Sequence, residues 1–234
     1  MSRYRIKITA RHPVPQNIGN PVLEYIEDKE RKSSRLRAQV FYDDLDIGVG
    51  VILDFYKHFE IIEDFGYTQT RALNRHTHIG SRVYKLKYYR SPPLPDTDRK
   101  EYLDAFTDIL QKYVEKIKSV KPGLGLTYIP SSRRVPDDIA YELGQRTGLE
   151  VHPFISINQE MENELKNIED MDLALELCEK KYLLDEAVLH PEKTYIIIDD
   201  IIGYGASIIT ILKKLYHLTN RKNYFLVLAK DVKR

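Results

Sequence analysis

The sequence predicts an α/β protein in which a parallel sheet, covered by helices on both faces, occupies the C-terminal half. Two observations lead to this prediction. Short apolar runs alternate with segments of helical periodicity after residue 95, and the runs lack the polar alternation of a half-exposed strand. We expect a Rossmann-like parallel core, preceded by a small α+β domain.

The N-terminal region has a mixed pattern. Arg3 to Thr9 alternates apolar and polar residues, as a half-buried strand does. Leu36 to Tyr42 and Ser81 to Tyr89 contain Val and Tyr, residues that favour strands, and we expect a strand at each. Val49 to Ile62 fits a helix or a buried strand, and its periodicity does not decide between them. We interpret residues 1–91 as the small α+β domain.

A proline-rich segment, Ser91-Pro92-Pro93-Leu94-Pro95, separates this region from the rest of the chain. Proline has no backbone N–H, so three prolines within four positions break a helix or a central strand and favour an extended connector. We therefore place the domain boundary here and assign residues 96–234 to the second domain.

The second domain begins with a predicted helix that carries one apolar stripe at i, i+3 and i+4 spacing. Asp96 or Thr97 is expected to cap its start, and Pro122-Gly123 to end it. The stripe consists of Tyr102, Leu103, Phe106, Ile109, Leu110, Tyr113, Val114 and Ile117.

The next segments alternate between strand and helix. Leu124 to Ile129 is a short apolar run that fits a buried strand. Pro136 is expected in the first turn of a second helix, which Gly148 ends. Glu150 to Ile155 is expected to be another strand. An acidic, mostly helical stretch follows to about Leu189.

The last three elements give the clearest pattern. Thr194 to Ile198 is the most strand-like segment of the chain, and we expect it to be a central core strand. A glycine-containing turn leads to a helix at Ile208 to Leu218, and a strand at Tyr224 to Ala229 follows. This strand–helix–strand order favours two parallel strands.

Composition and charge restrict the class of protein. With 42% hydrophobic and 30% charged residues and a net charge of +1, the chain is typical of a globular protein and not of a general polyanion binder. No apolar run reaches the roughly 20 residues of a membrane span, and Met1 to Ala10 lacks a signal-peptide core. The single cysteine, Cys178, cannot form an internal disulfide. We expect a cytoplasmic protein without a membrane partner.

The segment from residue 195 to 207, Tyr-Ile-Ile-Ile-Asp-Asp-Ile-Ile-Gly-Tyr-Gly-Ala-Ser, places polar residues at the end of an apolar strand. Ligands of open parallel sheets bind beyond such ends. Asp199 and Asp200 are costly to bury without hydroxyl or cationic partners, and a ribose offers hydroxyls. Gly203 and Gly205 let backbone N–H groups converge at the start of the next helix, which suits a phosphate. The combination predicts a sugar-phosphate site.

This segment resembles the phosphoribosyl diphosphate motif of the type I phosphoribosyltransferases. In that motif, four apolar residues precede two acidic residues, two apolar residues and a turn rich in Thr and Gly. The resemblance implies that Asp199 and Asp200 are catalytic and hold the ribose 2′- and 3′-hydroxyls. The 5′-phosphate would then lie against the turn, formed by Gly203, Tyr204, Gly205, Ala206 and Ser207. Mg²⁺ is implied as a cofactor, bound through the diphosphate of the ligand.

A second segment resembles the diphosphate-binding loop of the same family. Tyr128-Ile-Pro-Ser-Ser-Arg-Arg134 follows a predicted strand, and its form is most similar to the competence-associated (ComF-type) branch. The resemblance assigns the diphosphate to Ser131, Ser132, Arg133 and Arg134, and the guanidinium fork of Arg suits phosphate. Together with the closing strand, the likeness covers about Leu124 to Lys230.

The chain departs from this family in three places. Gly203 and Tyr204 occupy positions where Thr is usual. One cysteine cannot form the cysteine-rich zinc module of the ComF-type branch, and residues 159–186 are acidic where that branch is Arg-rich. The acidic segment is interpreted as a solvated helical face or as a mobile cover over the substrate.

Other classes of site fit the sequence less well. A nucleoside triphosphatase needs a G-x-x-x-x-G-K-[ST] loop, which the sequence lacks, and a dinucleotide fingerprint needs a glycine where Ile208 stands. His76 and His78 have a workable metal spacing without a further ligand pair, so ordinary loop histidines are expected. Arg82 to Arg90 has the composition of a nucleic-acid contact, although we expect a strand with one solvated face.

Two functions of different classes remain open. The first is a phosphoribosyltransferase that transfers phosphoribosyl to a base or another nitrogen nucleophile. The second is a catalytically silent module that binds a phosphoribosyl compound or nucleotide and signals through residues 1–91 to a protein or nucleic-acid partner. The aspartate pair favours the first, and Gly203 with Tyr204 favours the second. A homo-oligomer is compatible with both, and Asp200→Asn is expected to weaken ligand binding without loss of stability.

Overall fold

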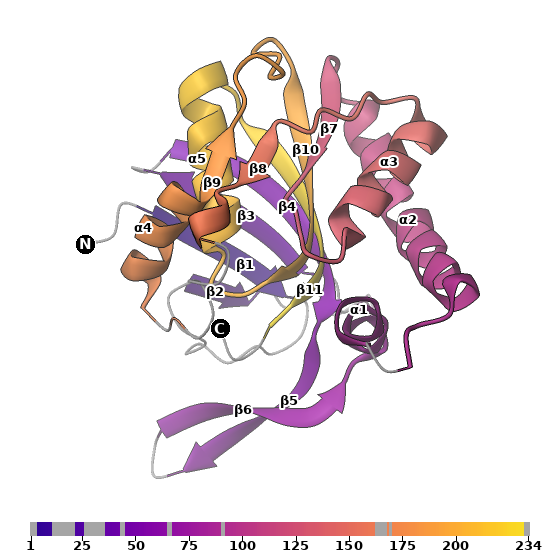
Figure 1. The fold of residues 1–234 in the computed structure, drawn as a ribbon. Helices are drawn as coiled ribbons and strands as arrows, with labels where there is room; N and C mark the ends of the chain where they lie inside the picture. The colour runs from indigo at the N-terminus through magenta and orange to yellow at the C-terminus, as the bar shows by residue number, and fades with distance from the viewer. Residues whose placement is uncertain are drawn as a thin grey trace.

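The computed structural model describes residues 4–10, 22–25, 36–42, 45–64, 67–89, 92–161, 168 and 170–231. Its centre is a seven-stranded sheet with the strand order β2-β1-β3-β4-β11-β10-β7 (Figure 1). The four strands β4, β11, β10 and β7 run parallel, and antiparallel β3 connects them to β1. The predicted α/β class with a mostly parallel sheet is confirmed.

The strands of the main sheet are β1 (Tyr4–Ala10), β2 (Val22–Tyr25), β3 (Leu36–Tyr42), β4 (Leu45–Phe55), β7 (Leu124–Tyr128), β10 (Thr194–Ile202) and β11 (Asn223–Lys230). Two smaller sheets pair β5 (Lys57–Asp64) with β6 (Tyr67–His76) and β8 (Ile155–Ile157) with β9 (Tyr182–Leu184). The helices are α1 (His78–Tyr88), α2 (Asp96–Lys118), α3 (Val135–Thr147), α4 (Met171–Lys181) and α5 (Ala206–Thr219), and a 3₁₀ turn lies at Gln159–Met161.

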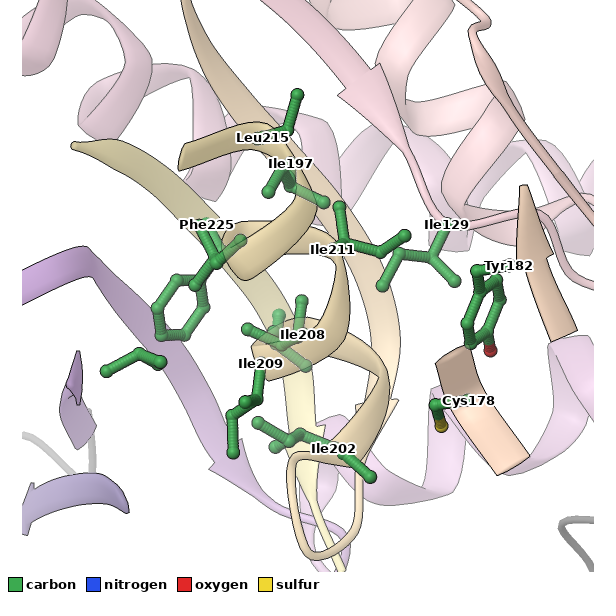
Figure 2. Close-up of a cluster of buried hydrophobic side chains, with 14 of the residues drawn as sticks. Ile129, Cys178, Tyr182, Ile197, Ile202, Ile208, Ile209, Ile211, Leu215 and Phe225 are labelled. Atoms are coloured by element: carbon green, nitrogen blue, oxygen red, sulfur yellow. The ribbon is translucent and has the colours of Figure 1, made fainter. Parts of the chain in front are cut away.

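Helices cover both faces of the sheet (Figure 1). On one face lie α1, α2 and α3, and the predicted stripe of α2 buries Phe106, Leu110 and Val114 completely. On the other face lie α4 and α5, and Figure 2 shows Ile208 and Ile211 of α5 in the second core cluster. Each such buried side chain contributes roughly 1.5–3 kcal/mol, so the two cores hold the three layers together.

The main sheet contains strands from both sides of the proline-rich segment. Gly50 of β4 lies opposite Phe225 of β11, and a Cβ on Gly50 would lie 2.3 Å from the Phe225 carbonyl oxygen. This close pairing therefore requires glycine. Residues 92–95 connect α1 to α2, and the division of the chain into domains 1–91 and 96–234 stays a prediction.

The strand predicted at Ser81 to Tyr89 is wrong, because these residues belong to helix α1 and its C-cap. Thr77 caps the helix, and its hydroxyl oxygen accepts a hydrogen bond from the Gly80 N–H at 2.9 Å. Val83 and Leu86, one helical turn apart, are buried. The cap and this buried pair outweigh the strand preference of Val and Tyr.

Two further boundaries differ from expectation. Val49 to Ile62 is strand, as one alternative proposed, but it is divided at Tyr56 between β4 and β5. Helix α2 has Pro95 as its N-cap without a side-chain cap bond, so neither Asp96 nor Thr97 caps it, and the helix ends at Lys118.

The elements around α3 are confirmed only in part. Pro136 lies in the first turn, and Gly148 ends the helix in the left-handed conformation with φ 70°. Only Val151 of the strand expected at Glu150 to Ile155 bridges to Leu126 of β7, because the chain then leaves the main sheet to form β8. In the acidic stretch, α4 is helical as expected, whereas residues 162–167 and 169 lie outside the described part.

The strands expected near both ends of the chain are confirmed as β1, β3, β10 and β11, and the helix between the last two is α5. Strand β10 pairs on one side with β11 and on the other with β7, as a central strand should. Among the described helices, none has the length and apolar character needed to cross a membrane.

Candidate functional site

Strand β10 runs further than the apolar segment that predicted it. Its pairing with β11 continues to Ile202, which lies opposite Lys230, so Asp199 and Asp200 lie within the strand. Both aspartates are buried, with exposed fractions of 7% and 3%. The expectation that this pair marks the end of the strand is therefore wrong, because β10 continues to Ile202.

The turn after β10 leads directly into α5. Gly205 is the N-cap of the helix and has φ 90°, a conformation that other residues rarely adopt. The first turn of α5 leaves backbone N–H groups without partners inside the helix, and the helix dipole adds partial positive charge there. The turn therefore has the properties of an anion-binding site.

A pocket of about 160 Å³ lies beside this turn. It contains Asp199, the predicted phosphate-binding residues and apolar side chains from α4 and its surroundings. The lining residues are Ile168, Ala174, Cys178, Asp199, Ile201, Ile202, Gly203, Tyr204, Gly205, Ala206, Ser207 and Ile208. One cavity thus brings together a carboxyl group and the start of α5.

A hydrogen bond from the backbone of Asp200 fixes the carboxyl group of Asp199. Its Oδ1 accepts a hydrogen bond from the Asp200 N–H at 2.8 Å. Burial raises the pKa of Asp199 well above its ordinary value, and the charge of Asp200 raises it further, while Lys87 opposes both effects. The environment therefore favours the protonated carboxyl, which can donate a hydrogen bond as well as accept one.

Ser207 is linked to two side chains that the sequence argument did not include. The Tyr182 hydroxyl lies 3.1 Å from Ser207 Oγ, and Cys178 Sγ lies 3.9 Å from the same oxygen. Burial raises the pKa of Cys178 to about 11, so its thiol stays protonated. Ala174, Cys178 and Tyr182 follow one another at intervals of four. This spacing is the signal in the sequence that could have placed all three on one side of the pocket.

Asp200 lies on the opposite face of the sheet from the pocket, because successive side chains of a strand alternate. Its Oδ1 accepts a hydrogen bond from Lys87 Nζ of α1 at 2.7 Å. Its Oδ2 is buried and has no hydrogen-bond partner among the described residues. The two aspartates therefore do not form one surface in this structure.

The predicted diphosphate loop lies at the end of β7, next to β10. The Ile129 N–H donates to the Ile198 carbonyl oxygen at 3.0 Å, which fixes the start of the loop. Arg134 is in the left-handed conformation, with φ 55°, and its Nε lies 3.7 Å from Asp137 Oδ2. Burial raises the pKa of Asp137, and Asp200 adds to this effect. Asp137, in the first turn of α3, is thus within electrostatic reach of Asp200.

The predicted site residues fall into two groups. Asp199 and residues 203–207 line the pocket, whereas Asp200 and Ser131, Ser132, Arg133 and Arg134 do not. Ser132, Arg133 and Arg134 are exposed, and the buried Ser131 hydroxyl has no partner in the described part of the chain.

The described residues contain no group of three or more His, Cys, Asp or Glu side chains that could hold a metal ion. His76 Nδ1 lies 3.2 Å from the Tyr56 carbonyl oxygen, and its ring stacks on Tyr84. His76 is the last residue of β6 and His78 the first of α1, so the two histidines do not lie in a loop as expected.

The raised pKa of Asp199 predicts a pH-dependent stability. The folded protein holds this proton more tightly than the unfolded chain, so the stabilisation is complete below about pH 3.9 and is lost as pH rises through the folded-state pKa. Asp199→Asn removes this loss while it keeps an acceptor for the Asp200 N–H. We expect its melting temperature near neutral pH to exceed that of the unmodified protein by at least about 2 °C.

Thermal unfolding between about pH 4 and pH 8 tests this expectation. The difference in melting temperature should shrink toward the acidic end, because the carboxyl is then neutral in both the folded and the unfolded chain. Asp172→Asn, on the exposed start of α4, is the control and should show no such trend. A constant difference across the pH range would contradict the assignment.

No protein-family model matches the chain, and no curated protein matches it significantly. The class of this protein is therefore described from its fold and its candidate site alone. The protein is an α/β protein with a mostly parallel sheet and a pocket between β10 and the start of α5 that contains the carboxyl group of Asp199.

Proposed function

We propose that the chain binds 5-phosphoribosyl diphosphate or a related nucleotide with Mg²⁺. The observation that supports this proposal is the shared pocket of Asp199 and the start of α5. A sugar phosphate needs hydroxyl partners and an anion site a few ångströms apart, and this lining supplies both. The resemblance to the type I phosphoribosyltransferases, which rests on the same segment of the chain, gives the same assignment.

The 5′-phosphate would lie at the N-terminus of α5. The N–H groups of Ala206 and Ser207 are in the first helical turn, where no intrahelical acceptor is available. Ser207 Oγ adds a donor, and its contact with the Tyr182 hydroxyl fixes its position. Tyr204 also lines this pocket, and we expect its ring to turn away from the bound anion.

The ribose would contact Asp199 on the pocket side. Asp200 is buried on the opposite face of the sheet beside Lys87, so it could accept a second ribose hydroxyl only after the end of β10 has moved. Its second oxygen, Oδ2, is free for a new hydrogen bond. Ligand binding at both aspartates therefore requires a local rearrangement of the end of β10.

The diphosphate would lie against residues 131–134, where Arg133 and Arg134 present exposed guanidinium groups. Mg²⁺ would reach the site as part of the ligand complex, bound to the diphosphate. When bound, Mg²⁺ supplies positive charge that stabilises diphosphate as a leaving group. In a transferase, Asp199 and Asp200 would orient the ribose. A nitrogen nucleophile would then form a bond to C1′ as the bond from C1′ to the diphosphate oxygen breaks.

A catalytically silent sensor is the second candidate function. The ion pair of Lys87 with Asp200 and the position of Tyr204 in the pocket favour it, because both restrict the geometry needed for transfer. Such a module would bind the same ligands and signal through the N-terminal half, whose helix α1 carries Lys87. The two candidates differ in one respect, the release of diphosphate.

Thermal unfolding with Mg²⁺ and 5-phosphoribosyl diphosphate tests the binding proposal. Saturation at 100 times Kd stabilises the folded state by about 2.7 kcal/mol, which corresponds to roughly 5–10 °C. Ser207→Ala should lose most of this increment, while Ser119→Ala, at the exposed end of α2, should keep it. The proposed site would be rejected if the melting temperature rose with none of the three ligands 5-phosphoribosyl diphosphate, ribose 5-phosphate and a nucleotide. Diphosphate release with added bases then separates transferase from sensor.

A further inference from the structure

Helix α1 and the end of β6 carry a row of stacked aromatic rings. The His76 ring lies 4.7 Å from the ring of Tyr56 and 4.8 Å from the ring of Tyr84, on which it stacks at 29°. Tyr84 continues the row to Tyr88, one helical turn later, with ring centroids 5.5 Å apart. The Tyr56 carbonyl oxygen contacts His76 Nδ1, so the row is attached to the protein at its buried end.

The other end of the row is open to solvent. Tyr84, Tyr88 and the adjacent Tyr89 have exposed fractions of 41%, 49% and 45%. Single exposed aromatic residues are common, but Tyr84 and Tyr88 lie together on one helix, and exposed apolar groups that gather in this way can mark a binding site. Figure 1 shows α1 beside the hairpin of β5 and β6, which projects away from the main sheet. We call His76, Tyr84, Tyr88 and Tyr89 the aromatic row.

The surroundings of the aromatic row are basic. The sequence contains six Lys and Arg residues between Asp64 and Asp96 and no Asp or Glu. Lys87 is neutralised by Asp200, but Arg75 and Arg82 have no carboxylate partner among the described residues. Arg82 lies 5.6 Å from the ring of Tyr102 on α2, which keeps its guanidinium beside α1. The stretch of chain that carries the row therefore has a net positive charge.

We propose that this surface binds single-stranded nucleic acid. Aromatic rings stack on unpaired bases without regard to sequence, and cations beside them neutralise the phosphate backbone. None of these residues lines the pocket beside α5, so the inference is independent of the function proposed above.

Fluorescence anisotropy of a labelled oligothymidylate of about 20 nucleotides, with the full chain and at low salt, tests this proposal. Tyr84→Ala combined with Tyr88→Ala should weaken binding at least about tenfold, because each base stack contributes about fivefold or more. The matching double Phe variant keeps the rings and should retain the affinity. Tyr141→Ala, which removes a tyrosine of similar exposure (43%) on α3, should bind as the unmodified protein does.

Arg82→Ala separates the charge contribution from the stacking contribution. It should reduce the slope of log affinity against log salt by about 0.7, the value for one phosphate contact to a single strand. The double Ala variant should leave this slope unchanged. Melting temperatures of all variants show whether each remains folded.

Three results would overturn the inference. They are no binding of the oligonucleotide at low salt, equal binding by the folded double Ala variant, and equal or tighter binding of duplex DNA, an acidic peptide or anionic vesicles. The last result would assign the surface to another class of partner.

Discussion

Asp200→Asn is expected to lower the melting temperature by about 6–12 °C. Removal of one member of a buried ion pair costs roughly 3–5 kcal/mol, and Lys87, whose side chain is 19% exposed, favours the lower end of this range. For a chain of this size, 1 kcal/mol corresponds to about 2–4 °C. The carboxamide keeps the shape of the side chain, so the loss reports the charge alone. This expectation replaces the one drawn from the sequence, in which Asp200→Asn caused no loss of stability.

A double-mutant cycle provides the control for this prediction. Lys87→Met combined with Asp200→Asn removes both charges and should recover most of the stability that either single change loses. The stabilisation by phosphoribosyl diphosphate, measured on the same variants, reports the second role of Asp200. If Asp200 also contacts the ribose, the ligand increment should fall by roughly 1.5–3 kcal/mol in Asp200→Asn. An unchanged melting temperature in that variant would contradict the buried pair.

Gly50→Ala is expected to cost about 3 kcal/mol or more in the free energy of unfolding. The new methyl group would lie 2.3 Å from the backbone carbonyl oxygen of Phe225, and backbone in a paired strand cannot easily yield. Because β4 and β11 join the two halves of the chain, the change should destabilise both halves together. Urea unfolding followed by circular dichroism measures the loss.

Gly123→Ala is the control for this substitution. Gly123 has φ 67° and no atom within 4 Å of the added methyl group, so only the left-handed backbone conformation opposes alanine there. The cost should be about 1–2 kcal/mol. Equal losses at the two positions would mean that the pairing of β4 with β11 is looser than described.

The sequence predicted best where one local pattern determined the structure. The apolar run before Asp199 could only be a buried strand, and the glycines after it could only form a turn into α5. At α1, in contrast, Tyr and Val favoured a strand, and the deciding contacts were the Thr77 cap and burial against the sheet. Those contacts depend on tertiary packing, which periodicity does not report.

The candidate site also has a part that the local sequence predicts and a part that depends on tertiary contacts. The pocket residues on either side of Gly205 were predictable because they follow one another in the chain. The separation of Asp199 from Asp200 was not, because it depends on the continued pairing of β10 with β11 as far as Ile202. Lys87 lies more than a hundred positions before its partner, so no local pattern could connect them.

The edge of the sheet at β7 is already paired within the chain. The Leu126 N–H donates to the Glu150 carbonyl oxygen at 2.9 Å, and the His152 N–H donates to the Leu126 carbonyl oxygen at 2.8 Å. These are the positions that a strand from a second molecule would need in order to extend the sheet. The short segment after α3 therefore protects this edge at Leu126, in the middle of β7, against intermolecular strand addition.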